Sequence, residues 1–104
     1  MVDRNLHSPA RHCLEKAHQA NRNLATGPGR INERLYDAFL AFGPLSPEHF
    51  PEGNARNTFS KFYQWITADG QVRASLNAMS EENAIKLAHL LLRLEYELEI
   101  ETET

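Results

Sequence analysis

The chain has 104 residues, of which 41% are hydrophobic and 24% are charged, and its formal net charge at pH 7 is −3. This length suits one domain with a modest core, and the composition excludes the collagen-like and disordered classes of protein. The longest apolar run, Leu87 to Leu94, is interrupted by His89 and Arg93 and is far shorter than the ~20 residues of a membrane span. We therefore expect one helical domain over residues 1–104 and no membrane partner.

Cysteine usage and charge distribution give the next constraints. Cys13 is the single cysteine, so an internal disulfide is impossible, and residues 1–12 lack the apolar segment of a secretory signal. The cytoplasm is the expected location. Residues 1–34 carry six basic and three acidic side chains, whereas the remaining residues carry five basic and eleven acidic ones. This polarity favours contacts between oppositely charged surfaces of partners or subunits.

The first expected helix runs from a cap at Ser8, with Pro9 in the first helical position, to about Leu24. Small and apolar residues recur on one side of it at spacings of three and four, which predicts close packing against other helices. These residues are Ala10, Cys13, Leu14, Ala17, Ala20 and Leu24.

The other side of this helix carries basic residues. Together with two arginines that follow the helix, they form what we call the basic stripe: Arg11, Lys16, His18, Arg22, Arg30 and Arg34. Such a stripe is typical of a surface that contacts nucleic-acid phosphates or an acidic protein, although the net negative charge of the chain argues against nucleic acid. The nearby histidines and Cys13 point in different directions around the helix, so no metal site is expected in this stretch.

The middle of the chain divides at glycine and proline residues into two expected helices, Asn32–Phe42 and Asn57–Ala68, with one further turn after Ser46. The apolar side chains of the first are Leu35, Tyr36, Phe39, Leu40 and Phe42. The second has a core stripe of Phe59, Phe62, Tyr63 and Ile66. Trp65 lies at the edge of that stripe, where it either covers the rim of the core or anchors a partner.

A short helix, Gln71–Ala78, is expected to lead into the last helix, which Ser80 caps and which runs from Glu81 to about Leu98. Residues 71–91 loosely resemble a helix-turn-helix. The glutamates at the start of the second helix would face the anionic groove of DNA, which favours a structural turn instead.

The last helix has more apolar surface than a surface helix needs. Its apolar arc covers about 240° of the helical wheel, against the ~100° that faces a core in an ordinary surface helix. Either three helices of the same chain surround it, or part of the arc contacts another chain. The second alternative makes Ile85, Leu92 and Tyr96 candidate partner-binding residues.

Glutamates alternate with other residues from Glu95 to Glu103. Alternation is the period of a strand, and on a helix Glu95 and Glu99 would point back into the apolar arc, so we expect the helix to fray near Leu98. Residues 1–7 and 99–104 are expected to be flexible. Glu95 and Glu99 are candidates for binding a basic surface, such as the basic stripe of a neighbouring subunit.

No residue pattern predicts catalysis, since the chain lacks a recognisable nucleophile turn and a glycine-rich phosphate loop. We predict an all-α, single-domain bundle of four main helices joined by short helical turns, with no enzyme activity, cofactor or metal. The predicted function is protein binding as a regulator, adaptor or inhibitor, with self-association through the last helix and an acidic half suited to a nucleic-acid-handling partner. The alternative function is a nucleic-acid-binding accessory protein that uses the basic stripe.

Overall fold

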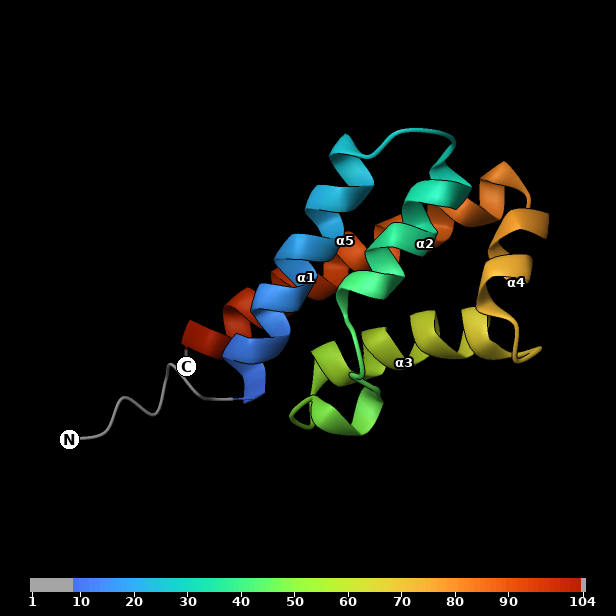
Figure 1. Cartoon of the computed structure of the whole chain (residues 1–104). Helices are drawn as coiled ribbons and strands as arrows, with labels where there is room; N and C mark the ends of the chain where they lie inside the picture. Colours follow the sequence, from blue (N-terminus) through green and yellow to red (C-terminus); the bar gives the residue numbers. More distant parts are fainter. Residues whose placement is uncertain (1–8, 104) are drawn as a thin grey trace.

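The computed structural model describes residues 9–103 (Figure 1), and within this range every regular element is helical. The predicted all-α bundle is therefore confirmed. Its elements are α1 (Pro9–Thr26), α2 (Ile31–Ala41), the 3-10 turn η2 (Pro47–His49), α3 (Asn54–Thr67), α4 (Val72–Ala78) and α5 (Glu81–Glu103). Over the same residues, none of the helices has both the length and the apolar character that crossing a bilayer requires.

The long helix α5 forms the back of the bundle in Figure 1. The helices α1 and α2 lie side by side in front of it, α3 crosses below them, and α4 joins α3 to the start of α5. Because α1, α2 and α3 all pack against α5, the core lies between α5 and these three helices.

The small-residue side of α1 packs inward as the spacing predicts. Cys13, Ala17 and Ala20 are almost completely buried, and Leu24 continues the same side at the end of the helix. Small side chains let α1 approach both α2 and α5 closely. The expected cap, Ser8, lies outside the described residues.

Aromatic rings fill the core between α2 and α3. Phe42 ends α2, Phe50 follows η2, and both pack against Phe59 of α3, with ring centroids 5.0 and 4.4 Å from that of Phe59. The turn after Ser46 therefore carries a phenylalanine into the core. The buried side of α2 follows Leu35 and Phe42 and leaves Leu40 exposed on the opposite side.

The two largest differences from the expected helix boundaries are that α3 begins at Asn54 rather than Asn57 and that α5 continues to Glu103 rather than ending near Leu98. One contact explains both differences. The Glu101 carboxylate accepts a hydrogen bond from the backbone N–H of Ala55, with N···O 3.1 Å, and so caps the start of α3. Because Leu98 is also fully buried, the last turns of α5 are held in the bundle.

Gly53 makes room for this cap. Its φ of +146° is a conformation that L side chains rarely adopt, and a Cβ at this position would lie 3.1 Å from the nearer Glu101 carboxylate oxygen. The glycine supplies no side-chain cap of its own, so a carboxylate from a distant part of the chain takes that role.

The alternating glutamates suit this helix because residues two apart on a helix differ in direction by about 200°. Glu95 therefore faces α1, whereas Glu97 faces α3 and accepts a hydrogen bond from the Thr58 hydroxyl. Glu101 lies on the α3 side as well. The alternation of glutamates therefore does not indicate fraying. Successive glutamates of this pattern point alternately toward α1 and toward α3.

Candidate functional site

The most prominent unpartnered feature of the described residues is an apolar stripe on the outer face of α5. We call it the outer stripe, and its members are 43 to 63% exposed: Ile85, Leu92, Tyr96 and Ile100. On a helix these positions fall within about 80° of one another and extend over about 22 Å along the axis. Large apolar side chains so aligned and exposed are typical of a surface that binds another protein.

The inner face of the same helix is closed. Leu87, Leu91, Leu94 and Leu98 are at most 1% exposed and belong to the core. Three helices do pack against α5, as one sequence-based alternative required, but they leave the outer stripe open. Ile85, Leu92 and Tyr96 thus lie at the surface in a single line, as the other alternative required.

Ile100 is a member of the outer stripe that the sequence analysis missed. Its spacing of four residues from Tyr96 is the signal that identifies it on a continuous helix. It was overlooked because the helix was expected to end near Leu98.

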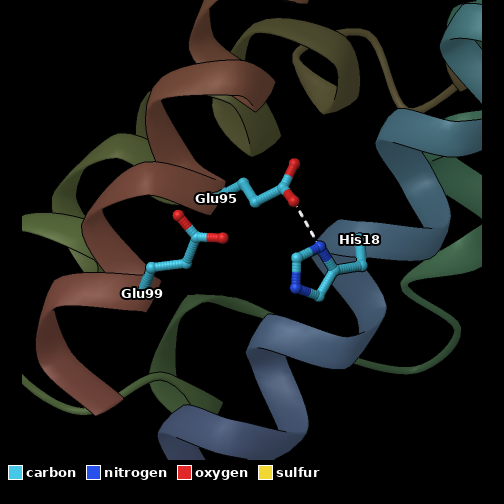
Figure 2. Close-up of side chains that lie close together, drawn as sticks. All are labelled: His18, Glu95 and Glu99. Carbon is cyan, nitrogen blue, oxygen red and sulfur yellow. Dashed lines mark ion pairs between the residues drawn. The ribbon is translucent and has the colours of Figure 1, made fainter. Parts of the chain in front are cut away.

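Beside the outer stripe, Glu95 and Glu99 of α5 come close to His18 of α1 (Figure 2). The His18 Nδ1 forms an ion pair with one oxygen of Glu95. The Asn21 side-chain N–H₂ donates to the other oxygen at 2.7 Å and to the Leu91 carbonyl at 3.0 Å. One member of the basic stripe, His18, therefore meets an acidic surface, and that surface is the last helix of its own chain.

The same three side chains are the described residues best placed to hold a metal ion. One ligand atom from each of His18, Glu95 and Glu99 lies within 4.8 Å of the others, and imidazole and carboxylate are donors that Zn²⁺ accepts. The sequence analysis did not consider Glu95 and Glu99 as metal ligands. The ion pair and the Asn21 hydrogen bond account for the position of Glu95 without a cation, so we assign this cluster to the contact between α1 and α5.

The basic stripe does not form one continuous cationic surface. The Arg34 guanidinium donates to the Leu24 carbonyl at 2.9 Å and so caps the end of α1. Arg30 precedes α2, where its backbone N–H donates to the Glu33 carboxylate. Arg22 is exposed and Arg11 and Lys16 are half-buried. Its members thus have separate surroundings, and two of them help to end or begin helices.

The remaining exposed apolar residues lie away from the outer stripe in the chain. Trp65 is on α3 and is 37% exposed, which agrees with its predicted position at the edge of the core stripe. Leu40 on α2 is 53% exposed. Leu92 has nearly the same exposed fraction, 55%, so Leu40 is a suitable control position for substitutions of Leu92.

A polar depression of about 330 Å³ lies between the loop after α1, α2 and α4. Tyr36, Asp37 and Arg73 line it, and the Arg73 guanidinium lies 5.2 Å from the centre of the Tyr36 ring. This cation–π contact packs α4 against α2. We assign the depression a structural role.

Cys13 lacks the surroundings of a nucleophile. Burial, and then the nearby negative charge of Glu101, raise the pKa of its thiol to about 11. Reactive cysteines have a lowered pKa instead. The thiol is therefore protonated and unreactive near neutral pH.

Comparison with known proteins gives no relative: no family model, no curated protein and no solved structure matches this chain. The functional assignment accordingly rests on the geometry of the chain itself.

Proposed function

We propose that this chain is a non-enzymatic, cytoplasmic protein-binding module whose binding surface is the outer stripe of α5. The observation that carries the proposal is the exposure of Ile85, Leu92, Tyr96 and Ile100 along one continuous helix. An exposed line of apolar side chains at spacings of seven and four is the pattern with which a helix packs against a groove or another helix.

The free energy gained by burying the outer stripe is too small to hold a partner by itself. Covering four half-exposed apolar side chains contributes about 4 kcal/mol at ~25 cal/mol per Å². Association of two proteins costs at least ~4 kcal/mol in lost rigid-body freedom. Apolar contact alone therefore does not give a stable complex, and a partner must also match the charged residues beside the stripe.

The alternative of nucleic-acid binding has less support. Glu95 and Glu99 lie beside His18, where they would repel a phosphate, and Arg34 is already hydrogen-bonded to the end of α1. Enzyme activity has little support as well, because the raised pKa of the Cys13 thiol disfavours the thiolate.

The proposal is tested by photo-crosslinking in cells of the native host. A photoreactive phenylalanine analogue replaces Tyr96 in one variant and Leu40 in the control. We expect covalent protein adducts from position 96 and none from position 40, and Leu92→Glu should abolish the adducts. Equal adducts from the two positions, or no adduct from position 96, would refute the proposal.

A further inference from the structure

We infer that His18, Glu95 and Glu99 form a binding site for one divalent transition-metal ion, with Zn²⁺ as the best match, and that the ion joins α1 to α5. Figure 2 shows the three side chains directed toward one another from the two helices. Their ligand atoms lie within 4.8 Å of one another. The sequence-based expectation was that the chain has no metal, and this inference departs from it because two of the three donors come from α5. The site uses no residue of the outer stripe, so the inference goes beyond the proposed function.

Helix geometry brings the three donors together. Glu95 and Glu99 are four residues apart, so their carboxylates lie on one side of α5 about one turn apart. His18 extends from α1, which packs along α5. Carboxylates from one helix and an imidazole from its neighbour are the kind of donor set that metal sites between packed helices use.

The position of Glu99 is the observation that points to a cation. The contact between α1 and α5 accounts for Glu95, but among residues 9–103 the Glu99 carboxylate has no hydrogen bond or ion pair. Glu99 is exposed, so its side chain is free to extend into solvent. It lies instead beside a second carboxylate, where the two like charges repel each other. A divalent cation between the two carboxylates removes this repulsion.

Asn21 holds one of the ligands in place. Its side-chain N–H₂ donates to one oxygen of Glu95 at 2.7 Å and to the Leu91 carbonyl at 3.0 Å, and the other oxygen of Glu95 faces His18. Carboxylate ligands of metal ions are typically oriented by such hydrogen bonds from neighbouring residues. Donor atoms on a tetrahedral Zn²⁺ lie about 3.3 Å apart, so rotation of the exposed His18 and Glu99 side chains is enough to close the site.

The donors select the class of metal. Imidazole nitrogen binds Zn²⁺ and its neighbours in the first transition series, whereas Mg²⁺ and Ca²⁺ prefer sites made of oxygen alone. Three protein donors leave the fourth position of a tetrahedral ion for water, which reaches the site because His18 and Glu99 are exposed. We therefore expect Zn²⁺ to bind far more tightly than Mg²⁺.

The inference is tested first by isothermal titration of the chelator-treated chain with ZnCl₂. We expect one Zn²⁺ per chain for the wild type, and binding weakened by about tenfold or more for Glu99→Gln and for His18→Gln, because each loses one of three donors. Glu82→Gln and His12→Gln make the same changes at exposed positions outside the cluster, so they are the controls and should bind as the wild type does. Absence of Zn²⁺ binding by the wild type, equal Zn²⁺ affinity of Glu99→Gln, or equal affinity for MgCl₂ would overturn the inference.

Thermal unfolding separates a metal site from a contact that is only structural. An ion that binds the folded chain alone stabilises it, so Zn²⁺ at about ten times its Kd should raise the Tm of the wild type by about 5–10 °C. Glu99→Gln should show a much smaller rise. Without Zn²⁺ its Tm should equal or exceed that of the wild type, because the repulsion between the carboxylates is gone.

A lower Tm of Glu99→Gln than of the wild type without Zn²⁺ would show that Glu99 serves the contact between α1 and α5 instead, and would contradict the inference. Circular dichroism checks that each variant is folded. Because Glu99→Gln retains the pairing of His18 with Glu95 and the Asn21 hydrogen bond, it tests the metal site even if His18→Gln fails to fold.

Discussion

The two faces of α5 are similar in sequence and opposite in environment. The inner face presents leucines that are at most 1% exposed, whereas the outer stripe presents residues of similar hydrophobicity that are 43 to 63% exposed. The difference shows that the apolar content of a helix does not by itself decide what is buried. The positions of α1, α2 and α3 around α5 decide it. The inner side of the helix thereby stabilises the fold, and the proposed binding uses the outer side.

The largest expected effect comes from breaking the inner face. Leu94→Ala should lower the free energy of unfolding by about 2–5 kcal/mol, because it leaves a cavity in a fully buried site. Urea denaturation, followed by circular dichroism at a protein concentration too low for association, measures the change. Leu92→Ala is the matched control and should change it by less than about 0.5 kcal/mol. Equal losses for the two leucines would contradict the division between the faces.

The second largest effect is a pH dependence of stability that comes from Cys13, on the buried side of α1. The pKa of the Cys13 thiol is raised to about 11, so the folded state favours the neutral thiol and the unfolded state the thiolate. The stability from Cys13 is therefore complete below the ordinary thiol pKa and is lost as the pH rises toward about 11. We expect the free energy of unfolding to fall by about 2 kcal/mol relative to Cys13→Ala between pH 8.5 and 11, at ~1.36 kcal/mol per pKa unit. Parallel pH dependences of the two proteins would rule out this coupling.

The third effect concerns Glu101, which lies between the inner and the outer face of α5 and caps the start of α3. Glu101→Gln should lower the free energy of unfolding by about 1 kcal/mol, because it removes the negative charge at the start of α3. Glu103→Gln, at an exposed position two residues later, is the control and should have no measurable effect. Chemical denaturation of the three proteins decides the point. Loss of stability in Glu103→Gln alone would contradict the assignment of the cap.

The smallest effect is expected on the outer face. Tyr96→Ser should leave the free energy of unfolding of the monomer within about 0.5 kcal/mol of the wild type, because the ring is largely exposed in the single chain. Thermal unfolding at low concentration measures this quantity. A strong fall in monomer stability would mean that the outer stripe also supports the fold.

The elements that sequence reasoning predicted depend on local spacing. The buried side of α1, with Cys13 and Ala17, and the core stripe of α3, with Phe59 and Phe62, follow directly from the helical period. These predictions succeeded because the residues concerned face the core wherever the neighbouring helices lie around it.

The features that sequence reasoning missed depend on contacts between distant residues. The end of α5 depends on Glu101 reaching the Ala55 N–H, 46 residues earlier, and a local pattern of glutamates cannot reveal such a contact. The pairing of His18 with Glu95 likewise requires α1 and α5 to be placed side by side.

The cap at the start of α3 has a consequence for synthesis of the chain. The ribosome makes the start of α3 well before it makes Glu101, so the N–H groups there can be capped by this carboxylate only after most of α5 has emerged. During that interval water must hydrate the first turn of α3. Docking of the last turn of α5 beside Gly53 therefore joins two segments that are far apart in the order of synthesis.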